Sequence, residues 1–218
     1  MSLWIKICGV TSVDDAELAV TAGADAVGVN LVPSSKRRVD EATARAIVSA
    51  VGDRAEVIAV VADSDVQALL ALRTELGFGS LQLHGNESPD VLERLLPFAY
   101  RALRIGTAAD VREAQRFGGA RLLADAKVEG ALGGTGHSFD WALVTELARE
   151  RALILAGGLR PDNVAKAVTA VRPFGVDTAS GVEGTDPRRK DPDKVARFIE
   201  AARRGAREAG LDSAQGVD

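Results

Sequence analysis

Short apolar runs alternate along the chain with longer segments in which apolar residues recur at helical spacing. The apolar runs, which predict β-strands, lie at 4–8, 26–31, 57–61, 81–84, 101–105, 122–125, 153–156 and 175–178. The first predicted helix is bracketed by a cap at Thr11-Ser12 and by Gly23. The other predicted helices lie at 40–51, 64–76, 88–96, 108–117, 140–151, 161–171 and 193–209.

The strand-like runs are almost entirely apolar, which is typical of parallel strands buried on both faces. Roughly eight strand-helix units in 218 residues approach the usual size of a (β/α)8 barrel. We therefore predict a single (β/α)8 TIM barrel over residues 1–210, followed by a frayed C-terminal tail over 211–218. An open, doubly wound α/β sheet is the alternative, because it produces the same alternation.

The amino-acid composition limits the kinds of partner that this chain is expected to bind. The chain is 46% hydrophobic and 27% charged, with a formal net charge of -4, which argues against nucleic acid as a partner. One Cys excludes a disulfide framework or a Cys-based zinc cluster, and two His argue against a His-rich site, so no metal is expected. No apolar run approaches the ~18 residues of a spanning helix. With no signal-peptide pattern at its start, the chain is expected to be cytoplasmic, without a membrane partner.

Polar residues interrupt the apolar runs where strands end, and in a barrel the strand ends and the loops after them carry function. Lys6 and Cys8 are two positions apart and share a face, as do Gln82 and His84. Asp125 closes the sixth strand-like run. If these side chains point into the barrel mouth, they surround one cavity, in which Lys6, Gln82 and His84 are expected to contact the substrate.

Each of these residues also has a structural interpretation. A buried lone Cys commonly behaves as a small hydrophobe, although Lys6 and the following turn favour a thiolate at Cys8. His84 is equally compatible with a packing role in which its ring is hydrogen-bonded. Asp125 is compatible with a cap or with an ion pair to Lys127.

Glycine-containing turns follow the last two strands. Gly157-Gly158 comes directly after the seventh strand and Ser180-Gly181 after the eighth. Backbone amides in such turns bind anions, and many barrels hold a phosphate at these two loops. The residues predict a phosphate site, with ordinary tight turns as the alternative.

Two more loops complete the predicted barrel mouth. Gly133, Gly134 and Gly136 lie in a long loop after the sixth strand and suggest a lid. The basic triplet 36–38 includes Arg37, whose planar guanidinium suits a carboxylate. A basic triplet by itself is usually solvated surface, but opposite a phosphate site it suggests a substrate with two anionic ends.

The motifs together resemble those of the phosphoribosylanthranilate isomerase family. They are Lys6-Ile7-Cys8-Gly9-Val10-Thr11, Gly23-Ala24-Asp25-Ala26-Val27-Gly28, Ser35-Lys36-Arg37, Gln82-Leu83-His84-Gly85, Gly133-Gly134-Thr135-Gly136, Phe139-Asp140-Trp141, Ala156-Gly157-Gly158-Leu159, Pro161-Asp162-Asn163-Val164, Val176-Asp177 and Ser180-Gly181-Val182-Glu183. The resemblance runs from about Trp4 to Ile199 and keeps the family's motif order.

This resemblance implies a (β/α)8 barrel of tryptophan biosynthesis that performs an Amadori rearrangement of N-(5'-phosphoribosyl)anthranilate without a cofactor. It places the general base at Cys8, the general acid at Asp125 and the binder of the anthranilate carboxylate at Arg37. Ring opening needs a proton at the furanose oxygen and sugar C2 must then lose one, which suits an acid and a base on opposite sides of a cavity.

Other functions stay open at this point. Another phosphosugar barrel, such as a ribulose-phosphate epimerase or an indoleglycerol-phosphate synthase, shares the fold. The epimerase needs metal-binding His and Asp residues, and the synthase needs Lys and Glu at several strand ends. A non-catalytic phosphosugar-binding barrel and additional activity on the aminoimidazole-carboxamide ribonucleotide of histidine biosynthesis are further alternatives. The expected partner is a small phosphorylated molecule, and the chain is expected to be a monomer or a homodimer.

Overall fold

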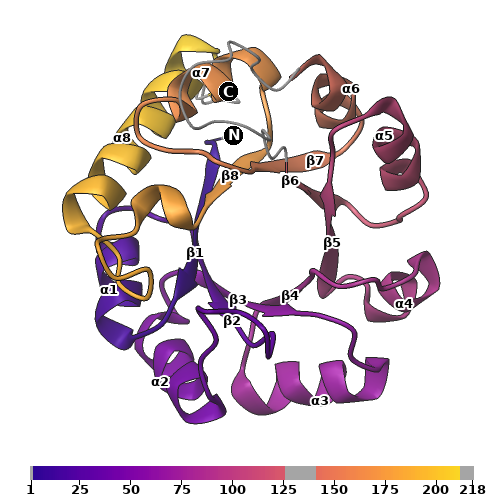
Figure 1. Cartoon of the computed structure of the whole chain (residues 1–218), viewed down its shortest axis with the longest axis vertical. Coiled ribbons are helices and arrows are strands. Elements are labelled where there is room, and N and C mark those ends of the chain that lie inside the picture. Colours follow the sequence, from indigo (N-terminus) through magenta and orange to yellow (C-terminus); the bar gives the residue numbers. More distant parts are fainter. Residues whose placement is uncertain (1, 126–140, 212–218) are drawn as a thin grey trace, which may run out of the picture.

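The computed structural model describes residues 2–125 and 141–211, in which parallel strands close into a barrel in sequence order and helices surround it (Figure 1). The strands are β1 (Trp4–Val10), β2 (Ala26–Asn30), β3 (Glu56–Val61), β4 (Ser80–Leu83), β5 (Ala99–Arg104), β6 (Arg121–Asp125), β7 (Ala152–Ala156) and β8 (Gly175–Thr178). The helices are α1 (Val13–Thr21), α2 (Glu41–Val51), α3 (Val66–Leu76), α4 (Pro89–Leu95), α5 (Ala108–Gln115), α6 (Ala142–Glu150), α7 (Val164–Val171) and α8 (Pro192–Glu208), with a short 3-10 helix η1 (Ser180–Val182).

The pairing of the first strand with the last decides between the two predicted architectures. Trp4 of β1 lies opposite Gly175 of β8, and the two strands continue in parallel register to Ile7 and Thr178. An open sheet has two unpaired edge strands, whereas this sheet has none among the described residues. The predicted (β/α)8 barrel is therefore confirmed, and the doubly wound alternative is wrong.

Local sequence explains where most helices begin. The Ser12 hydroxyl accepts a hydrogen bond from the Asp15 amide and caps α1, as predicted, while Gly23 just beyond its C-cap has a φ of 101°. The prediction for α7 is wrong at its start. Pro161 lies in the turn before the helix, which begins at Val164. Residues 212–218, most of the predicted tail, and the predicted lid loop lie outside the described residues.

The barrel interior is packed with side chains, and two aromatic rings stack at its amino-terminal end. Trp4 and Phe174 stack with their ring centroids 6.1 Å apart. The guanidinium of Arg121 lies over both rings and forms an ion pair with Glu56 at 2.8 Å. Above them, apolar residues fill the lumen: Ala26, Ile58, Tyr100, Ala102, Leu123, Ile154 and Ala156. A cavity lined by residues of every strand lies toward the carboxyl ends of the strands.

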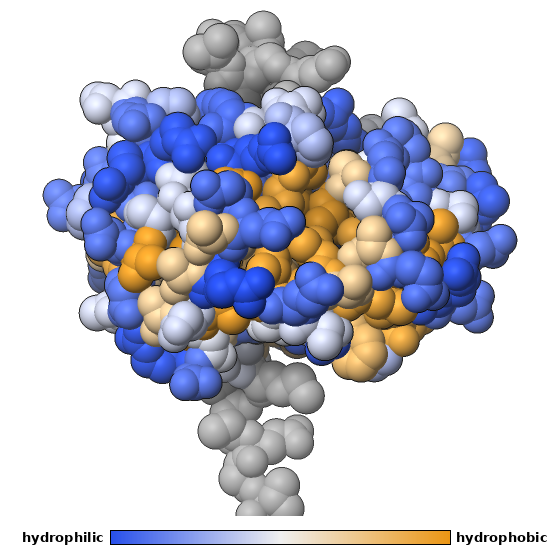
Figure 2. Space-filling model, turned by 90° about the horizontal axis from the view of Figure 1, so that it is seen from below, coloured by the Kyte–Doolittle hydropathy of each residue, from blue (hydrophilic) through white to orange (hydrophobic). Residues whose placement is uncertain are grey.

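The outer wall carries polar residues with apolar side chains showing between them. Figure 2 views this wall from the side of α2 and α3. Among the described large apolar side chains only Phe98 is exposed, at 39%, and Arg73 lies over its ring at 3.8 Å. No helix within the described residues combines the length and apolar character needed to cross a membrane.

Candidate active site

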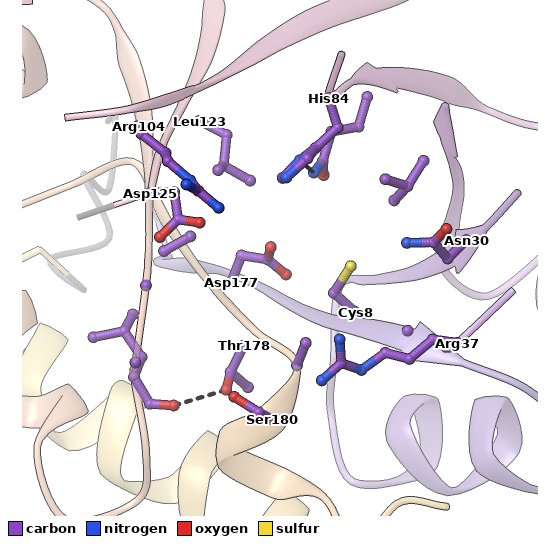
Figure 3. Close-up of a pocket in the computed structure, with 18 residues that line it drawn as sticks. Cys8, Asn30, Arg37, His84, Arg104, Leu123, Asp125, Asp177, Thr178 and Ser180 are labelled. Carbon is purple, nitrogen blue, oxygen red and sulfur yellow. Dashed lines mark hydrogen bonds between the residues drawn. The ribbon is translucent and has the colours of Figure 1, made fainter. Parts of the chain in front are cut away.

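A cavity of about 320 Å³ opens at the carboxyl ends of the strands (Figure 3). Every strand contributes to its lining, so the closed barrel is what brings these residues together. The lining residues are Cys8, Gly9, Asn30, Arg37, Val60, Gln82, His84, Arg104, Leu123, Asp125, Ala156, Gly157, Gly158, Leu159, Asp177, Thr178, Ala179 and Ser180.

Cys8 lies in the cavity wall with only 9% of its surface exposed. Its register partner on β2 is Gly28, which has no side chain to occupy the same space. A Cβ on Gly28 would lie 2.7 Å from the Cys8 Sγ and 2.9 Å from the Lys6 Cε. The thiol and the lysine therefore fit into the barrel because this position is glycine.

Lys6 is fully buried below Cys8 and is absent from the cavity lining. Its ammonium contacts the Asp177 carboxylate at 3.1 Å and donates a hydrogen bond to the Gln82 carbonyl oxygen at 2.9 Å. Burial alone would lower the pKa of Lys6, but the attraction of Asp177 and then of Cys8 leaves this pKa above its ordinary value. Lys6 is a permanent buried cation, and the structure places it under Cys8 rather than in the open cavity.

The expected stabilisation of a Cys8 thiolate by Lys6 is outweighed by burial. Burial raises the pKa of the Cys8 thiol, Lys6 opposes this effect, and the Asp177 charge adds to it. The Asp177 carboxylate lies 3.1 Å from the Lys6 ammonium, so its negative charge offsets part of the stabilisation that Lys6 gives to a thiolate. Cys8 is consequently a protonated thiol at neutral pH in the free protein, which corrects the sequence-based expectation.

His84 stands one residue beyond β4, with its side chain directed into the cavity (Figure 3). Its Nδ1 lies 3.2 Å from the Gln82 amide nitrogen, so the predicted pairing of these two residues on one face is observed. Burial lowers the pKa of His84, although Asp125 opposes the shift. The ring is therefore neutral around neutral pH.

Asp125 is the last residue of β6 and lies opposite Cys8 across the cavity, with Asp177 between them in Figure 3. In the sheet it pairs with Arg104 of β5 and Ala156 of β7. Gly133, Gly134 and Gly136, the predicted lid, lie outside the described residues.

The loops after β7 and β8 meet at one side of the cavity. Gly157 and Gly158 line it with φ angles of 95° and 66°, conformations that favour glycine. Ser180 faces them from the start of η1. The Thr178 hydroxyl donates a hydrogen bond to the Leu159 carbonyl at 2.8 Å and ties the two loops together (Figure 3).

Gly181 differs from the other three residues of the predicted phosphate site. It is absent from the cavity lining, and a Cβ on it would overlap the Leu159 carbonyl oxygen. Its glycine allows the loop after β8 to pack closely against the loop after β7. The structure thus gives Gly181 a packing role behind the cavity rather than a place in its wall.

Arg37 reaches the cavity from the loop after β2 and is held on two sides. Its aliphatic part lies where a Cβ on Gly9 would be, and its Nε donates to the Glu183 carboxylate. Lys190 lies 3.8 Å and Lys36 3.9 Å from Glu183, so three cations surround one nearly buried carboxylate. The guanidinium of Arg37 lies at the cavity on the same side as Ser180 in this view (Figure 3).

Sequence reasoning assigned no site role to several residues that line the cavity. Asp177, Arg104 and Asn30 all lie at the carboxyl ends of strands, and each interrupts or ends an apolar run. The strand-end rule that selected Asp125 was sufficient to find them. No sequence signal connects Glu183 to Arg37, because the two residues are 146 positions apart. Within the described ranges, no group of three or more His, Cys, Asp and Glu is arranged to hold a metal ion.

The fold and the cavity define a (β/α)8 barrel with a polar pocket at the carboxyl ends of its strands, where enzymes of this fold hold their active sites. A family model for N-(5'phosphoribosyl)anthranilate (PRA) isomerase matches residues 5–201. The chain belongs to this isomerase family, as its motifs predicted.

Known relatives agree with this assignment. N-(5'-phosphoribosyl)anthranilate isomerase of Magnetococcus marinus is 42% identical over 214 residues, covering 97% of this chain and 100% of the relative. The crystal structure of phosphoribosyl anthranilate isomerase from Thermotoga maritima has a TM-score of 0.81 at 33% identity, covering 92% of this chain and 98% of that one. A further isomerase structure, in complex with reduced 1-(o-carboxyphenylamino)-1-deoxyribulose 5-phosphate, has a TM-score of 0.79 at 31% identity, with coverage of 92% and 98%.

Proposed function

We propose that this chain converts N-(5'-phosphoribosyl)anthranilate to 1-(2-carboxyphenylamino)-1-deoxyribulose 5-phosphate, an isomerisation of tryptophan biosynthesis that uses no cofactor. The observation that carries the proposal is the placement of Cys8 and Asp125 on opposite sides of one cavity. The rim of this cavity holds the Gly157-Gly158 turn and Arg37, which suit the two anionic ends of that substrate. Membership of the isomerase family supports the same assignment.

Asp125 is the proposed general acid. Its proton goes to the furanose ring oxygen as the bond between that oxygen and C1 breaks, and the ring oxygen becomes a hydroxyl. The anilinic nitrogen supplies the electron pair that forms the C1 iminium. Asp125 ends β6, lines the cavity and is only partly exposed, so its carboxyl group can meet a ligand held there.

Cys8 is the proposed general base. The iminium at C1 acidifies the C2 proton, and the thiolate accepts it to give an enolamine. This enolamine then takes up a proton at C1 and loses one from the C2 hydroxyl, which gives the ketone. A thiol whose pKa is raised by burial is a strong base once ionised, although only a small fraction is ionised at neutral pH.

The other residues predicted for the site bind the substrate or support the catalytic residues. Backbone amides at Gly157, Gly158 and Ser180 bind the phosphate, and the terminal nitrogens of Arg37 bind the anthranilate carboxylate. The Nε of Arg37 is engaged by Glu183, which leaves the outer edge of the guanidinium for the ligand. Lys6, predicted as a substrate contact, is buried, so we assign it an electrostatic role through Cys8 and Asp177.

An activity assay tests the proposed function directly. Purified protein is given phosphoribosylanthranilate made in situ, and the aminoimidazole-carboxamide ribonucleotide substrate of histidine biosynthesis is run in parallel. Turnover of the first substrate, and its loss in Cys8→Ser with the fold retained, is the expected result. Turnover of the histidine substrate alone would contradict the proposal.

The assembly and location of the protein stay proposals. One solved structure of a relative describes monomers generated from a dimeric isomerase of Thermotoga maritima, so both states occur for that protein. We propose a monomer or a homodimer for this chain, to be separated by sedimentation, and a cytoplasmic location in keeping with a biosynthetic role.

A further inference from the structure

The side-chain amide of Gln82 has its orientation fixed by two buried donors. Its carbonyl oxygen accepts from the Lys6 ammonium at 2.9 Å and from the Tyr100 hydroxyl at 3.0 Å. All three residues are buried. An ammonium has no acceptor, so the atom that it contacts must be the amide oxygen and not the nitrogen. Burial also raises the pKa of Tyr100, so its hydroxyl keeps the proton that it donates.

With its oxygen turned toward Lys6 and Tyr100, Gln82 must turn its NH2 group toward His84. The distance from this nitrogen to His84 Nδ1 is 3.2 Å. An amide NH2 only donates, so Nδ1 must be unprotonated in order to accept. A neutral imidazole carries one proton, which therefore resides on Nε2, at the opposite side of the ring.

We propose that Gln82 is a positioning residue that holds His84 as the Nε2-H tautomer, so that His84 presents a neutral hydrogen-bond donor to the cavity. The cavity also contains the carboxylate of Asp177, which accepts hydrogen bonds. His84 adds a donor without adding a charge, and a donor of this kind binds an oxygen atom of a ligand. That this oxygen belongs to a phosphorylated sugar rests on the proposed function.

The tautomer also limits which residue can act as a base. The basic lone pair of His84 is on Nδ1 and is occupied by Gln82, so no basic nitrogen of this ring faces a ligand. Lys6 is equally unable to accept a proton, because its buried ammonium is paired with Asp177. Of Lys6, Cys8 and His84, Cys8 alone has an atom that lines the cavity and becomes a base when it loses its proton.

Nitrogen-15 NMR of the full chain labelled at histidine tests the tautomer. The chain has two His, His84 and His137, so His137→Gln assigns the His84 signals by elimination. Near neutral pH, we expect Nε2 of His84 to show the signal of a protonated ring nitrogen, and Nδ1 that of an unprotonated one. The reverse pattern in the wild-type protein would overturn the inference.

Two variants test whether Gln82 is the cause. Gln82→Glu replaces the donor beside Nδ1 by a carboxylate, and we expect the His84 proton to move to Nδ1, with reduced turnover. Tyr100→Phe is the matched control, since Lys6 still fixes the amide and the tautomer should not change. An unchanged tautomer in folded Gln82→Glu would refute the role of Gln82. If that variant does not fold, Gln82→Met serves instead, and it should leave His84 as a mixture of both tautomers.

The spectra separate this inference from the proposed function. A protein with the Nε2-H tautomer that does not turn over phosphoribosylanthranilate refutes the function and leaves the tautomer intact. An active enzyme whose His84 carries its proton on Nδ1 refutes the tautomer alone.

Discussion

Cys8 and Gly28 are partners across β1 and β2, and the thiol of Cys8 occupies the space that a side chain on Gly28 would fill. The separation from the Sγ to a Cβ built at position 28 is 2.7 Å, below normal van der Waals contact. The Lys6 Cε is nearly as close, at 2.9 Å. One glycine on a neighbouring strand therefore fixes the position of the proposed base.

Gly28→Ala should displace the Cys8 thiol and lower turnover, although Gly28 has no reactive group. Overpacking of this kind costs about 1–3 kcal/mol of stability, which thermal unfolding measures. Gly118→Ala is the control, because its Cβ would meet nothing closer than Leu96 at 3.9 Å. If Gly28→Ala retains full turnover, the thiol position is not critical.

Cys8→Ser should reduce kcat by about 10²–10⁴ while product affinity is nearly intact, because a hydroxyl does not ionise in the working range. In the wild type, kcat/KM should rise with pH as the thiol ionises. Because burial raises the Cys8 pKa, this rise should lie on the alkaline side of the ordinary thiol value of ~8.5. If kcat/KM of Cys8→Ser rises with pH in the same way as that of the wild type, the base is another group.

Asp125→Asn keeps the size and hydrogen-bonding capacity of the side chain but removes its transferable proton. We expect turnover to fall by about 10²–10⁴, as is typical when a general acid is lost. Single-turnover kinetics should locate the defect in the chemical step, with little change in product binding. Near-normal turnover in a folded Asp125→Asn protein would remove this residue from the mechanism.

Gly158→Ala should weaken binding of the phosphorylated substrate through the loop after β7. Gly158 has a φ of 66°, so alanine is strained there by about 1–2 kcal/mol, and its Cβ projects into open space beside the cavity. Gly210→Ala is a matched control with a φ of 67°, also with nothing within 4 Å of the added Cβ. Titration with inorganic phosphate should show weaker binding in Gly158→Ala only; equal affinities would place the phosphate elsewhere.

Arg37→Ala should raise Kd for the carboxylated product by one to two decades, since a charge-assisted contact contributes about 1.5–3 kcal/mol. Arg37→Lys should recover only part of this affinity, because an ammonium lacks the planar fork. Calorimetry with the product, and with an analogue lacking the aromatic carboxylate, measures both effects. If Arg37→Ala lowers the affinity for both ligands equally, Arg37 does not bind the carboxylate.

The sequence by itself determined the order of the elements. Apolar runs bounded by capping residues such as Ser12 predicted all eight strands. A strand of a parallel sheet is buried on both faces, so nearly all of its residues are apolar. The rule that functional side chains lie at the ends of barrel strands correctly placed Cys8, His84 and Asp125 around one cavity. Helix starts were less accurate where, as at Pro161, a turn precedes the first helical residue.

Only the tertiary structure decided which charges meet and which groups are buried. The closure of β1 on β8 brings Lys6 to Asp177, 171 positions away, and the Asp177 charge opposes the effect of Lys6 on the Cys8 thiol. Arg37 and Glu183 likewise meet only when the loops after β2 and β8 lie side by side. A pKa depends on burial and on all nearby charges together, so the local sequence around Cys8 was unable to predict the direction of its shift.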